Sequence, residues 1–256
     1  MGKSRTKTYV KGFDEALNGG IPGNKIVLIK GSTGTMKSSL AYYILSENAS
    51  AGKNSLYITF EQDRKSLEQQ MSSLGFMDNK VENLLHIFDL SKGKERLEEL
   101  SEKIRKMGED GSVASQGGKR QDLVISLLRR KIDEMRERMG FELVVIDSLD
   151  GLHLVMNPEN ARVSMFEFFE WMRNAGLTCL VVCEESLESS DPRGPEIHYE
   201  DFLADGIIEL RMEPINNIDI QRRIRCVKMR GTNHSTDYYS FFYDGSGFEI
   251  AKAIST

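Results

Sequence analysis

Long hydrophobic runs are missing from this sequence of 256 residues, and its first residues, MGKSRT, are polar. A helix that crosses a membrane needs about 20 consecutive apolar residues. A signal peptide needs an apolar core behind its charged start. Neither pattern is present, so the sequence predicts a protein without a membrane span, and we expect it in the cytoplasm.

Cysteine and histidine are scarce, with three and four copies, and both are scattered along the chain. Cys179, Cys183 and Cys226 are odd in number and form no CxxC pair. This pattern argues against a disulfide framework and against a zinc site. We expect the three thiols to be reduced and buried.

An excess of positive charge is also missing. The chain has 34 Lys and Arg against 39 Asp and Glu, which gives a net charge of −5. A protein that follows the phosphates of DNA needs clustered Lys and Arg. The charge balance therefore argues against a general duplex-DNA binder, and a local basic channel in a ring stays open.

Short β-branched runs alternate with longer amphipathic segments, which is typical of a parallel sheet covered by helices. We expect strands at 25–30, 54–60, 83–90, 141–147 and 177–185, and helices at 37–50, 64–76, 94–108, 122–140 and 159–176. Segment 186–202 is predicted as a loop and the Gly/Ser-rich segment 108–121 as a mobile loop. Four strand patterns after residue 206 predict a β-rich C-terminal extension, so residues 1–256 are expected to form one α/β domain.

The stretch GSTGTMKSS lies between a predicted strand and a predicted helix, which is the context of a phosphate-binding loop. In such a loop, backbone N–H groups and the helix N-terminus hold phosphates. Lys37 would reach the β- and γ-phosphates, and the Ser38 hydroxyl would ligate Mg²⁺. Met36 departs from the pattern, which has glycine before the lysine. The predicted nucleotide-binding residues are Gly31, Ser32, Thr33, Gly34, Thr35, Met36, Lys37, Ser38 and Ser39.

Two further strands end in carboxylates. LVVIDS is an apolar run that ends at Asp147, which predicts a second ligand for Mg²⁺ beside the phosphates. YITFEQD places Glu61 at the tip of another strand, where a carboxylate can polarise the water that attacks a γ-phosphate.

In these motifs, the chain resembles a single-domain member of the KaiC branch of the RecA superfamily, close to the RadA-like archaeal ATPases. The resemblance covers nearly the whole chain. It rests on GFDEALNGGIPGNKIVLIKG (12–31), YITFEQ (57–62), VVIDSLDGL (144–152), YEDFLADGIIEL (199–210) and VKMRGTNH (227–234).

The resemblance implies a RecA-like core that binds ATP and Mg²⁺ at subunit interfaces of a ring, typically a hexamer, with Glu61 as catalytic base. It also implies that Lys228 and Arg230 reach the γ-phosphate of the neighbouring subunit, where a cation supplied in trans neutralises transition-state charge. Glu184 and His234 are open as sensors or secondary contacts, or as structural polar residues.

Two departures bear on the activity. The family pattern has two adjacent glutamates where this chain has Glu61 and Gln62, and Gln62 has no titratable proton. Met36 must point away from the phosphates, or the loop must open. We therefore expect a Mg²⁺-dependent ATPase that acts as an oligomeric regulator or assembly factor with an unidentified protein partner. A non-hydrolysing ATP sensor, a RadA-like DNA-recombination paralogue and an autokinase are the alternatives.

Overall fold

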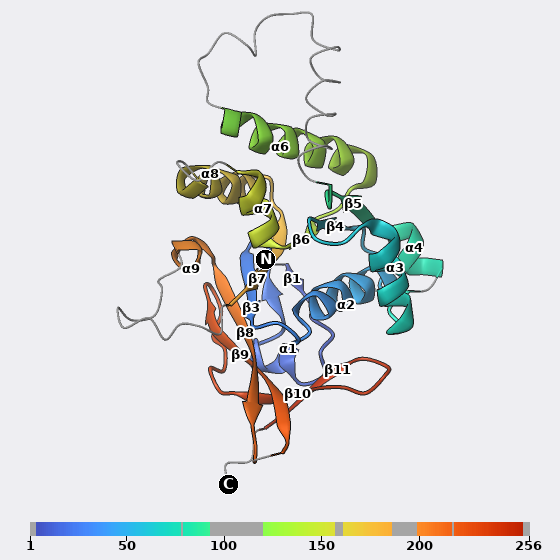
Figure 1. Cartoon of the computed structure of the whole chain (residues 1–256), viewed down its shortest axis with the longest axis vertical. Helices are drawn as coiled ribbons and strands as arrows, with labels where there is room; N and C mark the ends of the chain where they lie inside the picture. Colours follow the sequence, from blue (N-terminus) through green and yellow to red (C-terminus); the bar gives the residue numbers. More distant parts are fainter. Residues whose placement is uncertain are drawn as a thin grey trace, which may run out of the picture.

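The computed structural model describes residues 4–77, 79–92, 120–156, 161–185, 199–216 and 218–252. Nine strands of this part of the chain form one sheet, in the order β11-β10-β9-β8-β3-β7-β6-β4-β5. The six strands from β8 to β5 are parallel to their neighbours, whereas β9, β10 and β11 extend the sheet in antiparallel fashion. Figure 1 shows the resulting arrangement, with helices on both faces of the parallel part. The α/β sheet and its β-rich C-terminal extension are confirmed.

The strand bounds follow the β-branched runs of the sequence closely. The strands of the large sheet are β3 (Ile26–Gly31), β4 (Ser55–Thr59), β5 (Leu85–Asp89), β6 (Leu143–Asp147), β7 (Thr178–Glu184), β8 (Gly206–Pro214), β9 (Ile220–Met229), β10 (Tyr239–Tyr243) and β11 (Phe248–Lys252). A separate two-stranded sheet pairs β1 (Arg5–Thr6) with β2 (Ile21–Pro22).

The described helices are α1 (Phe13–Ala16), α2 (Lys37–Ser50), α3 (Arg64–Ser73), α4 (Asn79–Leu84), α6 (Arg120–Met139), α7 (Leu149–Val155), α8 (Ala161–Asn174) and α9 (Tyr199–Leu203). Each of the predicted helices 37–50, 64–76, 122–140 and 159–176 corresponds to one of them. The predicted helix at 94–108 and the predicted loop at 108–119 lie outside the described residues. No helix of the described part is long and apolar enough to span a membrane.

Three local predictions were wrong. The first residues of the predicted strand 83–90 belong to α4, and β5 begins only at Leu85. The end of the predicted loop 186–202 is helical, because Tyr199–Leu203 forms α9; residues 186–198 lie outside the described part. Residues 120 and 121, assigned to the mobile loop, already belong to α6. The sequence pattern did not predict the short helices α4 and α9, because one or two helical turns contain too few residues to show a period.

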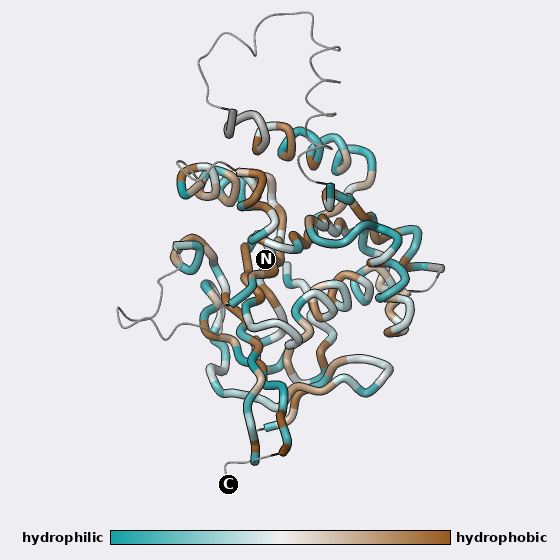
Figure 2. Tube along the Cα trace, in the orientation of Figure 1, coloured by the Kyte–Doolittle hydropathy of each residue, from teal (hydrophilic) through white to brown (hydrophobic). Residues whose placement is uncertain are grey.

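Successive side chains of the parallel strands point to opposite faces of the sheet and form two separate hydrophobic cores. On one face, Val27, Ile29 and Tyr57 pack with the buried side of α2, α3 and α4. On the other face, Ile26 and Leu28 pack with α6, α7 and α8. Figure 2 shows hydrophobic segments concentrated in the central strands and hydrophilic ones on the outer helices. Both faces of the sheet are therefore buried, and polar side chains collect at its edges.

The three thiols lie inside these cores. Cys179 and Cys183 belong to β7 and Cys226 to β9, and all three are free and buried. Burial raises the pKa of each thiol, to about 12 for Cys226. The expectation of buried thiols without a disulfide is confirmed.

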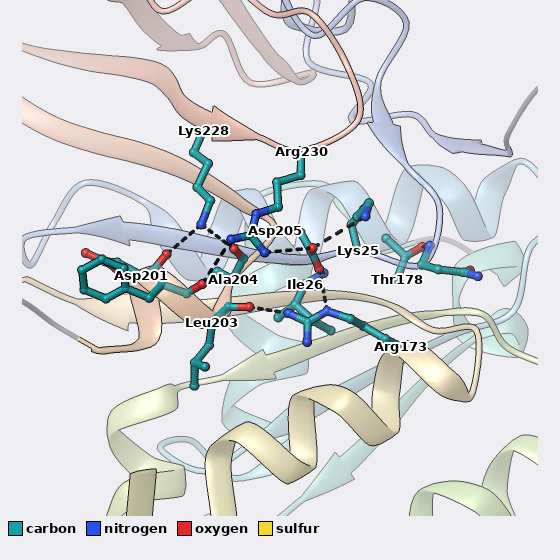
Figure 3. Close-up of polar contacts among 12 residues, drawn as sticks. Lys25, Ile26, Arg173, Thr178, Asp201, Leu203, Ala204, Asp205, Lys228 and Arg230 are labelled. Carbon is teal, nitrogen blue, oxygen red and sulfur yellow. Dashed lines mark hydrogen bonds and ion pairs between the residues drawn. The ribbon is translucent and has the colours of Figure 1, made fainter. Parts of the chain in front are cut away.

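Asp205 joins the start of β8 to the start of β3. Its carboxylate accepts a hydrogen bond from the Ile26 amide (3.2 Å) and one from Arg173 Nε (2.8 Å), and Lys25 Nζ lies 3.6 Å away. Arg230 Nη1 approaches the same carboxylate at 3.9 Å. Figure 3 shows the four positive or donating groups converging on this one acid. Burial alone would raise the pKa of Asp205, but the Arg173 and Ile26 hydrogen bonds and the Arg173 and Lys25 charges hold it below its usual value.

Replacing Asp205 with Asn should lower the free energy of unfolding by about 3 kcal/mol at pH 7, because a nearly buried anion with several cationic partners is lost. The pKa of Asp205 is lower in the folded protein than in the unfolded chain, where it is about 3.9. The stabilisation is therefore fully present above about pH 3.9, and it is lost as the pH falls through the pKa of the folded protein. Urea unfolding from pH 7 to pH 3 measures it. The difference between the two proteins should shrink as the pH falls below about 4, and a constant difference would contradict the ionic origin. Glu249→Gln, which removes the exposed pair with Lys11, is the control and should cost at most about 1 kcal/mol.

Candidate functional site

The carboxyl ends of β3, β4, β6 and β7 meet at one edge of the sheet. Strand β3 is followed by the loop at 32–36, and α2 starts directly after it. Strand pairing brings Thr59 of β4 beside Asp147 of β6, and Gly31 of β3 beside Glu184 of β7. Ligands of open parallel sheets bind at this edge. The predicted residues Lys37, Ser38, Asp147 and Glu61 therefore belong to one location, although they come from three separate segments.

The loop is closed by contacts that leave no room for a larger residue at its start. A Cβ on Gly31 would lie 2.2 Å from the Leu210 carbonyl oxygen, so only glycine fits there. The Thr35 hydroxyl donates to the Ser32 carbonyl (2.8 Å), and Lys37 Nζ donates to the same oxygen (2.9 Å). The loop is thus curled around the Lys37 side chain, which is buried.

Met36 has a left-handed backbone conformation, with φ 72° and ψ 31°, immediately before the first residue of α2. Glycine adopts this conformation freely, whereas a residue with a side chain is strained there by about 1 kcal/mol. The Met36 side chain is partly buried and packs against the core on the α2 face. Met36 therefore has the backbone geometry of a glycine. Its side chain packs against the core and so points away from the phosphates, which is the first of the two alternatives expected from the sequence.

Asp147 is a buried carboxylate at the end of β6. The Tyr57 hydroxyl donates to its Oδ2, while Oδ1 is buried and has no hydrogen-bond partner among the described residues. Burial raises the pKa of Asp147 to about 6, and nearby Glu61 contributes to the rise. The Tyr57 and Ser38 hydroxyls and the Lys37 ammonium oppose it. The Ser38 hydroxyl, the Lys37 ammonium and the free Asp147 oxygen are therefore close enough to act on the same ligand.

Glu61 lies beside Asp147 at the exposed rim of the edge. The Ser148 hydroxyl, which also caps α7 by accepting a hydrogen bond from the Gly151 amide, donates to Glu61 Oε1. Gln62 is exposed, and its backbone forms a turn with the Thr59 hydroxyl. Of the pair Glu61 and Gln62, Glu61 therefore presents the carboxylate at the exposed mouth of the site.

Two further residues contact the loop: Glu184, which the sequence left open as a sensor, a secondary contact or a structural residue, and Arg222, which the sequence did not suggest. Glu184 forms an ion pair with Lys37 Nζ (2.8 Å) and accepts a hydrogen bond from the Thr33 hydroxyl (2.5 Å). Arg222 of β9 donates to the Gly34 carbonyl oxygen at 3.2 Å. A polar residue at the end of a strand next to β3 is the signal that marks Glu184. Arg222 gives no such signal, because its place over the loop depends on how β8 and β9 pair.

Lys228 and Arg230 do not approach the loop of their own chain. Lys228 Nζ donates to the carbonyl oxygens of Asp201 (2.9 Å) and Ala204 (2.6 Å) at the end of α9, as Figure 3 shows. Arg222 contacts the loop, whereas Lys228 and Arg230 come six and eight residues later. At about 3.3 Å per residue of strand, Lys228 lies about 20 Å farther along β9 than Arg222, and Arg230 lies in the turn just beyond the end of β9.

Together, the loop between β3 and α2, the buried acid after β6 and the mainly parallel sheet with its antiparallel extension define a RecA-like P-loop fold. The family model described as "ATPase: KaiC" matches residues 6–254, so the chain belongs to the KaiC ATPase family.

Known relatives agree with this assignment. A UPF0273 protein of Thermotoga maritima is 28% identical over 96% of this chain and 95% of its own length. The circadian clock protein KaiC2 of Synechocystis is 24% identical over 97% of this chain, which corresponds to 40% of that longer protein. The crystal structure of a KaiC-like protein from Pyrococcus horikoshii has a TM-score of 0.75 at 23% identity and covers 97% of this chain and 99% of that one. That likeness shows the fold.

Replacing Asp147 with Asn should stabilise the free protein by about 3 kcal/mol at pH 7, because the folded pKa of about 6 exceeds the unfolded value of about 3.9. With the folded pKa raised, the wild type loses stability as the pH rises from about 4 to about 6, and the variant does not. The gain should therefore be complete above pH 6 and vanish below pH 4. Thermal or urea unfolding across this range measures it, with Asp237→Asn at an exposed carboxylate as control. A destabilised variant at pH 7 would show that the contacts of Asp147 with Tyr57, Ser38 and Lys37 outweigh the cost of burying its charge.

Proposed function

We propose that this chain binds ATP with Mg²⁺ at the loop of residues 31–39 and hydrolyses it slowly, within an oligomer whose subunits complete one another's sites. The observation that carries the proposal is the convergence of Lys37, Ser38, Asp147 and Glu61 at one edge of the sheet. Family membership supports nucleotide binding. We further propose ATP hydrolysis, Mg²⁺ binding and assembly of the subunits into a ring.

The donor set fits a magnesium ion. Asp147 Oδ1 is a buried oxygen without a partner among the described residues, and the Ser38 hydroxyl lies beside the same carboxylate. Within the described part, no cluster of three or more His, Cys, Asp or Glu forms a metal cage. Mg²⁺ characteristically binds with one or two carboxylates together with substrate phosphates and water, and it would supply charge neutralisation on those phosphates. Ser38 and Asp147 are the residues that would hold it.

The chain's own residues have distinct roles in the proposed reaction. Lys37 provides a buried ammonium for the terminal phosphates, and the backbone N–H groups of the loop and of the first turn of α2 face the phosphate chain. Glu61 orients and deprotonates the attacking water from the exposed rim, with Ser148 fixing its carboxylate. Because Gln62 cannot act as a base, Glu61 alone carries this step.

The positions of Lys228 and Arg230 support an action in trans. Both side chains lie on the far side of their own sheet from Lys37, where they cover carbonyl groups at the end of α9. Phe202 beside Arg230 is 63% exposed. The buried ring nitrogens of His234 have no hydrogen-bond partner among the described residues. An adjoining subunit would cover the Phe202 side chain and offer a phosphate to Arg230, whose side chain is 54% exposed.

Phosphate release by the wild type and by Lys37→Ala tests the function itself. We expect the wild type to release phosphate with Mg²⁺ present and Lys37→Ala to lose both ATP binding and release. ATP binding with ATP-dependent oligomer formation but no release would select the non-hydrolysing sensor instead. Equal binding or equal release in the two proteins would refute the site.

Mixing two inactive variants extends the test to the action in trans. Lys37→Ala retains its finger residues, and Arg230→Ala retains its loop. Mixed oligomers should therefore regain part of the activity, at sites where an intact loop faces an intact arginine. If the mixture stays as inactive as its components while native mass measurement shows mixed particles, Arg230 does not act in trans.

Replacing Met36 with Gly should retain ATP binding and leave turnover equal or higher, because glycine adopts the left-handed conformation without the strain of about 1 kcal/mol. Met36→Ala is the matched control, since it removes the same apolar packing but keeps a Cβ in the strained conformation. Calorimetric ATP binding and phosphate release measure the effect. Loss of binding in both variants would show that the Met36 side chain holds the pocket through its packing against the core.

A further inference from the structure

The Glu184 carboxylate is bound to the loop by both of its oxygens. Oε2 lies 2.8 Å from Lys37 Nζ, and Oε1 accepts a hydrogen bond from the Thr33 hydroxyl at 2.5 Å. An anion therefore already sits on the ammonium that would bind phosphate. Both described contacts are to side chains of the loop, one at its buried end and one at its exposed outer half.

The backbone of Glu184 is fixed, while its side chain has room to move. The Glu184 amide donates to Asp150 Oδ2 (2.9 Å), and the next amide, that of Glu185, donates to the Gly31 carbonyl oxygen (3.0 Å). The side chain of Glu184 is 45% exposed, compared with 7% for Lys37. Rotation about the side-chain bonds can thus move the carboxylate into solvent without disturbing β7.

Glu184 is ionised at neutral pH. Burial would raise the pKa of its carboxyl, but the hydrogen bonds from Lys37 and Thr33 and the Lys37 charge hold it below its usual value. A negative charge beside Lys37 repels a second anion that approaches the same ammonium. The contact therefore opposes the binding of any phosphate group that must take its place.

We propose that Glu184 occupies the position of the terminal phosphate and so determines how strongly the site prefers a nucleoside triphosphate over a diphosphate. The inference rests on the proposed function. In a phosphate-binding loop, backbone N–H groups hold the α- and β-phosphates and the lysine reaches the β- and γ-phosphates. Glu184 uses the lysine and the Thr33 side chain, and its described contacts leave the backbone cradle to the inner phosphates.

The Lys37 ammonium has three donors, of which the Ser32 carbonyl and Glu184 take two. The third can hold the β-phosphate of a diphosphate with Glu184 still paired, whereas a triphosphate must first displace the carboxylate. The displacement loses one charge-assisted contact and one hydrogen bond, so it weakens triphosphate binding selectively. After hydrolysis and release of phosphate, Glu184 returns to Lys37 and the diphosphate state is favoured. The residue thus sets the balance between the two nucleotide states of the proposed cycle.

Calorimetric binding of ADP and of a non-hydrolysable ATP analogue, each with Mg²⁺, tests this assignment. Glu184→Gln should strengthen binding of the analogue about three- to fivefold and change ADP binding less than about twofold, as expected for a partly exposed charge contact. Glu185→Gln is the matched control, with the same charge change one residue further along, and should leave the ratio of the two affinities unchanged. Thr33→Val should shift the ratio in the same direction as Glu184→Gln, by less.

Weaker binding of the analogue to Glu184→Gln would overturn the inference, because Glu184 would then help to bind the nucleotide. An equal gain for both nucleotides would also overturn it and indicate a general charge effect. A double-mutant cycle of Lys37→Met and Glu184→Gln on thermal unfolding, without nucleotide, measures the contact itself. No coupling in this cycle would refute the contact even where nucleotide binds. Clear coupling in a protein that binds neither nucleotide would refute the proposed function and show that the ion pair is structural.

Discussion

Burial of the parallel strands on both faces is the constraint on which the rest of the structure depends. Every residue of β3, β4 and β6 is buried, so a charged side chain can reach solvent only where a strand ends. At the carboxyl end of β6 this rule places Asp147 at the border between core and solvent, where burial raises its pKa and leaves one oxygen without a partner among the described residues. A buried carboxylate oxygen without a hydrogen-bond partner is stabilised by binding a cation, so Asp147 is suited to be a metal ligand.

The sequence predicted the parallel part of the fold because its strands are apolar, short and separated by amphipathic helices. It also predicted that Lys37, Asp147 and Glu61 meet, since the carboxyl ends of neighbouring parallel strands lie at one edge. What it could not give was the order of the strands. The contacts of Glu184 and Arg222 with the loop join residues about 150 and 190 positions apart, and no local pattern encodes such pairing. For the same reason, the intrachain contacts of Lys228 and Arg230 with α9 were not foreseen.

Two features of the loop modify the same phosphate site by different physical means. Met36 stores backbone strain in a conformation that glycine adopts freely, whereas Glu184 places an anion where the proposed function requires another anion. The first acts on the shape of the loop and the second on its charge. Under the proposed function, Glu184 opposes the triphosphate-bound state, whereas the Met36 strain is already present in the free loop. The slow turnover that we propose would therefore originate in the loop and its neighbouring strand, and the rest of the sheet would be unaffected.

The buried thiols have a consequence for chemical damage. Cys179 and Cys183 lie in β7 beneath the helices, and Cys226 lies in β9 of the antiparallel extension. Oxidants and alkylating reagents attack the exposed thiolate, and burial raises the pKa of all three groups. Reaction at any of them therefore requires the sheet to open. The rates of modification at β7 and at β9 would therefore report how often each of these two regions of the sheet opens.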